Sequence, residues 1–290
     1  MASARFKFLG TTPADFTKAR VVIVPFGFEA ATTYGQGTKK GPAAIAKAYA
    51  QVEAFDEELW QVTDEKIEII FLRNFYPKTF TEAQKNIQKI VGKILHDKKF
   101  PIVLGGEHSI TPFITEKYKK YFDDFSILQF DAHADLRDGY LGQKYSHAAA
   151  MRRCLDFSGI NLVQIGIRNI SQEDDELNFW EKNQKRIKTF WAKDKKNWKI
   201  NEILGALKEN VYLTFDVDAL DPSIMPATGT PEPGGLDWCE TLDILRAVAK
   251  AKKIIGADFV ELAPIKGLIA PDFLIAKLIY KTIGYIFDKS

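Results

Sequence analysis

The chain contains 290 residues, of which 46% are hydrophobic, so it is long enough to bury a sizeable core. Its 40 basic and 38 acidic side chains leave a formal charge of +2 and are spread along the chain, which argues against a nucleic-acid surface as its main purpose. No stretch approaches the 18 or so uncharged apolar residues of a membrane span, so we expect no membrane insertion.

Short apolar runs alternate with helix-length amphipathic stretches along the chain. We predict strands at residues 20–26, 67–72, 100–106, 125–131, 161–168, 186–191, 210–218 and 254–262. We predict helices at residues 42–55, 81–98, 109–120, 201–209, 239–251 and 271–287, with Thr81 as the N-cap of the second. The strands are almost continuously apolar, which is typical of strands covered on both faces. The pattern predicts an α/β fold whose mostly parallel sheet has about eight strands and helices on both faces.

No repeat, low-complexity segment or linker divides the sequence, so we expect one domain over residues 1–290. Cys154 and Cys239 lie far apart and form no CxxC pair, which favours a reduced, cytoplasmic protein. The first 20 residues contain lysine and aspartate and lack an apolar core, so we expect no signal peptide.

Polar side chains follow four of the predicted strands at their carboxyl ends. These residues are His108, Asp131, His133, Asp135, Asp216, Asp218 and Glu261. In open parallel sheets, ligands bind in the crevice beyond the carboxyl ends of the strands. We therefore expect a functional site at this edge of the sheet.

The spacing of these residues points to metal ions. Side chains at every second position of an extended segment face the same way, so Asp131, His133 and Asp135 can face one pocket, and so can Asp216 and Asp218. Unpaired buried aspartates would repel one another, and two divalent cations would cancel four of them. A mixed carboxylate and imidazole set without cysteine suits Mn²⁺, with Co²⁺, Ni²⁺, Zn²⁺ or Fe²⁺ as substitutes, and not a structural zinc site.

Each residue also has an ordinary structural explanation when it is taken alone, as a turn cap, a loop histidine or one partner of an ion pair. This applies to His108, Asp135, Asp138, Asp218, Asp221, Glu232 and Glu261. Six oxygen and nitrogen ligand types at one sheet edge would, however, be a large coincidence. Their joint occurrence favours the metal site.

Five motifs together resemble the ureohydrolase (arginase/agmatinase) family, on its agmatinase side. They are GGEHS (105–109), FDAHADLRD (130–138), YSHAAAMRR (145–153), TFDVDALDPSIMPATGTPEPGGL (214–236) and FVELAP (259–264). A weaker likeness over residues 24–45 extends the resemblance to nearly the whole chain, although Glu107 stands where many members have aspartate. The resemblance implies a three-layer α/β/α fold, a binuclear manganese centre with two Mn²⁺ per subunit, and a trimer or hexamer.

The resemblance also implies roles for individual residues. It assigns metal binding to His108, Asp131, His133, Asp135, Asp216 and Asp218. His147 matches the loop histidine proposed as a proton shuttle, and Glu261 matches the acid that holds the guanidinium group. The implied reaction is hydrolysis of a small guanidino compound, in the first place of agmatine to putrescine and urea, a step of polyamine biosynthesis.

The outer residues bear on the choice of substrate. Arg137 occupies the position where arginases have an asparagine, and it could meet the carboxylate of 4-guanidinobutyrate. Asp138 and Glu232, together with Glu173 and Asp174, could instead attract the distal ammonium of agmatine. Arginine, a guanidino-polyamine and formiminoglutamate are further alternatives.

Rival classes of function are a metal-binding homologue without activity, a two-metal phosphoesterase and a single-zinc deacetylase. Intact His147 and Glu261 count against the first. Phosphate-binding basic groups are sparse in the metal loops, which counts against the second. His108 and Asp218 would supply a second metal, which counts against the third.

Overall fold

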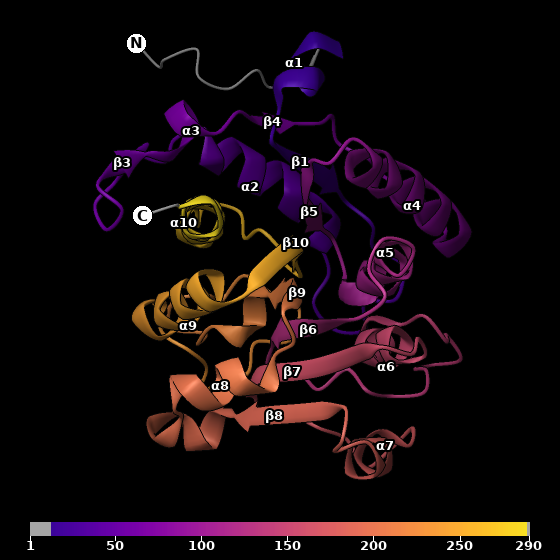
Figure 1. The fold of residues 1–290 in the computed structure, drawn as a ribbon. Coiled ribbons are helices and arrows are strands. Elements are labelled where there is room, and N and C mark those ends of the chain that lie inside the picture. The colour runs from indigo at the N-terminus through magenta and orange to yellow at the C-terminus, as the bar shows by residue number, and fades with distance from the viewer. Residues whose placement is uncertain (1–12, 289–290) are drawn as a thin grey trace.

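The computed structural model describes residues 13–288, and a parallel β-sheet forms its centre (Figure 1). Within this range the sheet has eight strands in the order β4-β1-β5-β10-β9-β6-β7-β8, and all neighbours pair in parallel. The strands are β1 (Val21–Phe26), β4 (Ile69–Phe71), β5 (Phe100–Gly105), β6 (Phe125–Phe130), β7 (Ile160–Ile167), β8 (Ile187–Trp191), β9 (Asn210–Asp216) and β10 (Lys253–Val260). The predicted α/β sheet is confirmed.

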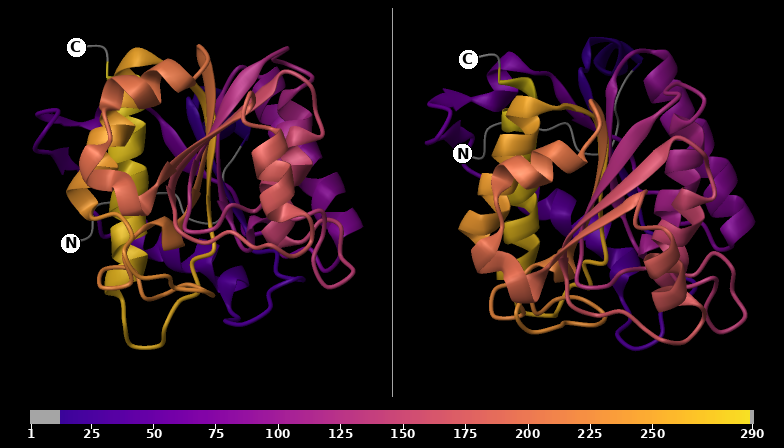
Figure 2. Two further views of the ribbon diagram at one scale, coloured as in Figure 1. Left: turned by 90° about the horizontal axis from the view of Figure 1, so that it is seen from below. Right: turned by 60° about the horizontal axis from the view of Figure 1, so that its bottom comes forward.

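Helices cover both faces of the sheet, and the views along it show the resulting layers (Figure 2). One face carries α2 (Gly41–Tyr49), α8 (Ile200–Ala206), α9 (Trp238–Ala251) and α10 (Ala270–Phe287). The other carries α4 (Phe80–His96), α5 (Thr111–Tyr118), α6 (Ala150–Leu155) and α7 (Glu176–Lys182). Each face therefore buries its own apolar core, as the three-layer prediction requires.

The first strand shows why its sequence is apolar throughout. Val21 and Ile23 pack into the core beneath α2 and α10, whereas Val22 and Val24 pack into the core beneath α4 and α5. Successive side chains of a strand point to opposite faces, so a sheet with two covered faces needs apolar residues at every position.

Several local features differ from the prediction. Thr79, and not Thr81, is the N-cap of α4, because the Thr79 side chain accepts a hydrogen bond from the backbone N–H of Glu82 at 3.2 Å. The prediction for Thr81 was therefore wrong by two residues.

Helices α1 (Pro13–Lys18), α3 (Thr63–Lys66), α6 and α7 were not predicted, since they are too short to show a clear helical period. The absence of a signal peptide was inferred from the first 20 residues, of which residues 1–12 lie outside the described residues, and it stays a prediction. Among the helices of residues 13–288, none is both long enough and apolar enough to cross a membrane.

The helix predicted over residues 42–55 ends at Tyr49, because the chain after it forms a hairpin of β2 (Phe55–Asp56) and β3 (Gln61–Val62). A buried ion pair holds this hairpin against α10. The Nζ atom of Lys281 lies 2.9 Å from Asp56 Oδ1 and 2.9 Å from Glu57 Oε1, and both Lys281 and Asp56 are buried. Local helical pattern is thus overridden by a partner 225 residues away in sequence.

Replacing Lys281 by methionine should lower the free energy of unfolding by about 3 kcal/mol, because Asp56 would be left buried without its cation. The loss can be measured by urea denaturation. Lys199→Met removes a lysine from an exposed pair with Glu202 and should cost less than about 1 kcal/mol. Equal losses in the two variants would contradict a specific role of the buried pair.

Candidate active site

The carboxyl ends of four neighbouring strands, β5, β10, β9 and β6, bring the candidate residues together. His108 begins a single helical turn after β5, and Asp131 directly follows β6. Asp216 is the last residue of β9, and Glu261 follows β10. Strands far apart in sequence therefore supply one site at the sheet edge, as the sequence predicted.

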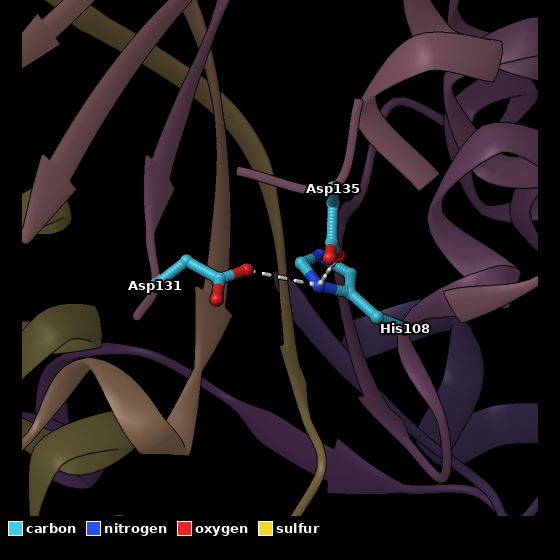
Figure 3. Close-up of side chains that lie close together, drawn as sticks. All are labelled: His108, Asp131 and Asp135. Carbon is cyan, nitrogen blue, oxygen red and sulfur yellow. Dashed lines mark ion pairs between the residues drawn. The ribbon is translucent and has the colours of Figure 1, made fainter. Parts of the chain in front are cut away.

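A first group of ligand atoms surrounds the imidazole of His108. Its Nδ1 atom lies 3.2 Å from Asp131 Oδ2, 3.1 Å from Asp135 Oδ2 and 3.5 Å from Asp216 Oδ2. Figure 3 shows Asp131 and Asp135 approaching this nitrogen from different sides. One ligand atom each from His108, Asp131 and Asp135 lie within 4.8 Å of one another, which is compact enough for a single ion.

A second group lies next to the first and shares Asp131 with it. His133 Nδ1 lies 2.9 Å from Asp218 Oδ2 and 3.7 Å from Asp131 Oδ1. Ligand atoms of Asp131, His133 and Asp218 again lie within 4.8 Å of one another. Because Asp131 belongs to both groups, the two groups lie side by side at the same edge of the sheet.

The aspartates of the two motifs shape their own loops. Asp131 Oδ1 accepts a hydrogen bond from the backbone N–H of His133 at 2.7 Å. Asp216 Oδ1 accepts one from the N–H of Asp218 at 2.9 Å. Aspartate side chains commonly bind the backbone two residues further on, which turns the chain. The i, i+2 spacing thus produces turns at the ends of strands, and not the extended segments that the sequence suggested.

Two of the candidate residues have left-handed backbone conformations, with φ of 54° at Asp135 and 66° at Glu261. Glycine adopts the left-handed region freely, whereas other residues adopt it at a cost in conformational free energy. Asp135 therefore reaches the first group by a backbone kink. The predicted convergence of Asp135 holds, whereas the extended geometry from which it was inferred does not.

The carboxylates repel one another strongly in the absence of a cation. Burial and the neighbouring charge of Asp131 raise the pKa of Asp135 to about 7. Burial, Asp218 and Asp131 likewise raise the pKa of Asp216 well above its usual range. A divalent cation would remove this repulsion, because it replaces the proton that Asp135 and Asp216 otherwise favour.

The other side of the His108 ring indicates which nitrogen is free for a metal. His108 Nε2 lies 2.8 Å from Thr214 Oγ1, and the Thr214 hydroxyl donates to Asp258 Oδ1. Thr214 has a single hydroxyl proton, so its oxygen must accept a proton from Nε2. In the neutral ring that metal binding requires, Nδ1 then carries the lone pair, and it is a buried atom without a hydrogen-bond partner among the described residues. A cation between Nδ1 and the facing carboxylates satisfies both.

A chain of buried amides supports the shared carboxylate. Gln129 Nε2 donates to Asp131 Oδ2 at 2.7 Å, and Gln164 Nε2 donates to Gln129 Oε1 at 2.8 Å. The Thr189 hydroxyl in turn donates to Gln164 Oε1 at 2.7 Å. Sequence analysis missed these residues, although each is a polar residue inside an apolar strand, as are Thr214 and Asp258. That interruption was the available signal.

A cavity of about 220 Å³ opens above the two groups. Among the predicted outer residues, Arg137, His147, Glu232 and Glu261 line it. Further lining residues that were not predicted are Thr32, Thr33, Tyr34, Gly35, Tyr140, Asn169 and Glu176. Asp138 is placed differently: its largely exposed side chain lies 2.7 Å from Arg153 and is not part of this lining, which does not support the predicted substrate contact.

The charged side chains of the outer cavity wall differ in whether they are already paired within the protein. Arg137 lies 2.9 Å from Asp174 and 3.9 Å from Glu176, and its guanidinium stacks over the Tyr140 ring at 4.4 Å. Its positive charge is therefore already paired with two carboxylates of the protein. Glu232 instead accepts a hydrogen bond from the Asn169 amide at 2.8 Å, which orients the carboxylate but leaves its charge in place.

His147 lies where its imidazole is neutral at pH 7. Burial, together with positive charge on His133 and His108, lowers the pKa of His147 to about 4. A backbone hydrogen bond to Ala31 opposes this shift. The neutral ring can accept a proton and pass it on, which suits a relay better than a resident acid.

Residues 19–284 match the sequence profile of the Arginase family. The chain belongs to the arginase family. This ureohydrolase is 38% identical over 282 residues to N(1)-aminopropylagmatine ureohydrolase of Synechocystis sp., with 93% of this chain and 90% of that protein covered. It is 33% identical to agmatinase of Bacillus cereus, with 89% of this chain and 88% of that protein covered. The crystal structure of agmatine ureohydrolase of Thermoplasma volcanium superposes with a TM-score of 0.83 at 27% identity, covering 97% of this chain and 95% of the other. The predicted family and fold are confirmed.

In the ureohydrolase, Asp258→Asn should weaken divalent-cation binding at the His108 group about 10- to 100-fold. The Tyr212 and Thr111 hydroxyls donate to Asp258 Oδ2, so the new amide would turn its oxygen to them and its NH₂ to Thr214. The Thr214 proton would then point at His108 Nε2 and drive the ring proton to Nδ1. Chelator competition measures the affinity.

Tyr212→Phe is the matched control, because it removes one hydrogen bond to Asp258 without reversing the chain of donors. Its affinity should stay within about threefold of the parent, since the proton on Nε2 is unaffected. A loss as large as that of Asp258→Asn would disprove the tautomer explanation.

Proposed function

We propose that this ureohydrolase cleaves the guanidinium group of a small cationic guanidino compound, in the first place agmatine, to urea and putrescine. The observation that carries the proposal is the pair of ligand groups that share Asp131 at the base of one cavity. The same cavity presents a buried carboxylate, Glu261, and a neutral imidazole, His147, to whatever molecule enters.

The proposal includes two divalent cations, with Mn²⁺ as the best fit to a site of mostly carboxylate oxygens and two imidazoles. Their ligands would be His108, Asp131, His133, Asp135, Asp216 and Asp218. When bound, such a pair lowers the pKa of water from 15.7 towards about 7 and so supplies a nucleophile at neutral pH. The orphaned Nδ1 of His108 and the mutual repulsion of the aspartates support this assignment.

Glu261 would bind and orient the substrate. Its Oε1 atom accepts the backbone N–H of His108 at 2.6 Å, which fixes the carboxylate beside the first ligand group. A guanidinium can donate parallel hydrogen bonds to a carboxylate, which holds the planar carbon in one orientation. Such positioning lowers the barrier because the reacting groups no longer have to find one another.

His147 would carry a proton to the departing amine. The tetrahedral intermediate must expel a primary amine, which is a poor leaving group until it is protonated. The neutral ring of His147 can take up a proton and deliver it there. General acid–base help of this kind usually contributes a factor of about 10² to 10⁴ in rate.

The outer wall supports a substrate with a positive distal end. The cations cancel the aspartates, Glu261 meets the guanidinium, and Arg137 is already paired with Asp174 and Glu176. Glu232 then offers its negative charge at the wall of the cavity, because its cationic neighbour, His133 at 3.9 Å, becomes a neutral ligand once a cation is bound. A distal ammonium would complement it, whereas the carboxylate of arginine or of 4-guanidinobutyrate would lack a free partner.

N(1)-Aminopropylagmatine is the second candidate. The relative of that name in Synechocystis is 38% identical, against 33% for the Bacillus cereus agmatinase. Both compounds share the guanidinium and a cationic chain, and the longer one extends further towards the mouth. Tyr34 lies there with 83% of its surface exposed, so its ring is available to a second cation. The trimeric or hexameric assembly, the single domain over residues 1–290 and the cytoplasmic location stay predictions.

The metal assignment predicts two Mn²⁺ per subunit after loading, because there are two ligand groups. Replacing His108 by alanine should loosen one ion preferentially, since it removes a ligand from one group only. Elemental analysis during dialysis against a weak chelator measures both. A ratio of one in the parent protein would exclude the binuclear proposal.

The substrate assignment predicts that agmatine exceeds arginine at least 100-fold in kcat/KM. Leaving the carboxylate of arginine unpaired, or close to Glu232, would cost about 2–4 kcal/mol, or roughly 30- to 1,000-fold. Urea release from agmatine, N(1)-aminopropylagmatine, arginine and 4-guanidinobutyrate at equal concentration measures the order. Faster turnover of arginine would overturn the agmatine proposal and leave guanidinium hydrolysis intact.

Two variants test the charge at the outer wall. Glu232→Gln should lower kcat/KM for agmatine about tenfold, since it removes a charge that faces the ammonium. Asp138→Asn removes a carboxylate that lies outside the cavity and should leave the substrate order unchanged. Preference for 4-guanidinobutyrate, abolished by Arg137→Ala, would support the rival assignment.

A further inference from the structure

The mouth of the cavity is formed in part by the loop of residues 28–37, which connects β1 to the single helical turn Thr38–Lys40 that precedes α2. Residues 32–35 of this loop line the cavity. The loop closes on itself, because the Glu29 carboxylate accepts the backbone N–H groups of Gly37 at 2.9 Å and Lys39 at 3.1 Å. This closure shapes the loop but does not attach it to the rest of the site.

The attachment comes from Glu107, the residue before His108. Its Oε2 atom accepts the backbone N–H groups of Ala30 at 2.8 Å and Ala31 at 2.7 Å. Its Oε1 atom accepts the Ser109 hydroxyl. The carboxylate is fully buried, so these charge-assisted hydrogen bonds are not weakened by water.

The backbone on either side of Glu107 reinforces the contact. The N–H of Glu107 donates to the Phe28 carbonyl at 2.8 Å, and the N–H of Gly106 donates to Phe26 at 3.0 Å. A β-carbon on Gly106 would lie 1.9 Å from the Phe28 oxygen, so only glycine permits this approach. The start of the mouth loop is therefore built directly onto the segment that carries His108.

The Ala31 peptide then connects Glu107 to the catalytic machinery. Its N–H donates to Glu107, and its backbone also accepts a hydrogen bond from the His147 imidazole, which raises the pKa of that ring. Directly after Ala31 the same loop forms the cavity wall, where Gly35 packs so closely on Gly229 that a β-carbon would lie 2.7 Å from the Gly229 Cα. A shift at Ala31 would therefore reach both the imidazole and the entrance.

We propose that Glu107 is a positioning residue for the proposed reaction: its carboxylate fixes the Ala31 peptide, and through it the imidazole of His147 and the wall formed by residues 32–35. The inference rests on the proposed ureohydrolase function for its kinetic consequences. The reach of the side chain is what matters, since the carboxylate must extend to two backbone N–H groups on a separate loop.

A matched pair of variants separates reach from charge. Glu107→Asp keeps the charge but withdraws the carboxylate by about 1.5 Å, the length of one carbon–carbon bond. Glu107→Gln keeps the reach and an acceptor oxygen but removes the charge. Charge alone could act through Glu261, because burial and then the nearby charge of Glu107 raise the pKa of Glu261. If the reach of the side chain is what matters, Glu107→Asp should be the more impaired variant. If the charge is what matters, Glu107→Gln should be the more impaired variant.

The first readout is hydrogen–deuterium exchange of residues 28–37 in the full-length protein without substrate. Exchange should rise about tenfold in Glu107→Asp, because Ala30 and Ala31 lose their acceptor, and stay within about threefold of the parent in Glu107→Gln. This measurement does not depend on the reaction. If the parent protein released no urea from any guanidino compound, the proposed function would fail while exchange still tested the attachment.

The second readout is kinetic. With agmatine, Glu107→Asp should lower kcat about tenfold and raise KM severalfold, and Glu107→Gln should change kcat by less than about threefold. His147→Asn should keep both metal ions and lower kcat about 100-fold. In that background Glu107→Asp should lower kcat by less than about a further twofold, because two residues that act together are not additive.

Three outcomes would overturn the proposal. Unchanged exchange in Glu107→Asp would show that the carboxylate does not hold the loop. A full tenfold loss of kcat in the His147→Asn background would show that Glu107 does not act through the imidazole. Near-parental behaviour of Glu107→Asp with an impaired Glu107→Gln would show that the charge, and not the reach, is responsible.

Discussion

The mutual repulsion of buried carboxylates is the constraint on which the site depends. Asp131, Asp135, Asp216 and Asp218 are all largely buried at one sheet edge, and the two imidazoles that face them, His108 and His133, cannot balance four carboxylates. The strand order places them there, and hydrogen bonds from backbone N–H groups and from Gln129 hold them in place. The fold therefore carries an electrostatic cost that cation binding relieves, so metal affinity and stability are coupled.

Side-chain hydrogen bonds between neighbouring strands hold the candidate ligands from within the sheet. The Thr214–Asp258 pair lies between β9 and β10, and the Gln129–Gln164 pair lies between β6 and β7. Both pairs are buried, and both replace apolar packing by directed hydrogen bonds. Such networks stabilise only when every member is satisfied, so each also determines which atom of a candidate ligand faces the centre.

The sequence predicted what depends on local pattern and on strand direction. Strand β1 was recognisable because Val21 to Val24 must be apolar towards two cores, and the candidate ligands were recognisable because they end such strands. Residues whose role depends on a distant partner were missed. The β2–β3 hairpin requires Lys281, and the ion pairing of Arg137 requires Asp174 and Glu176, and none of these partners is visible in the local sequence.

The contact between Gly35 and Gly229 has a consequence for how this enzyme can diverge. The entrance is bounded there by main chain on both sides, so its width is set by loop conformation and not by side-chain size. A point substitution elsewhere on the rim can change polarity, but a β-carbon on Gly35 would lie 2.7 Å from the Gly229 main chain and must displace a whole loop. Acceptance of longer or bulkier chains is then expected to evolve by insertion and deletion in residues 28–37, while the carboxylates on the sheet stay untouched.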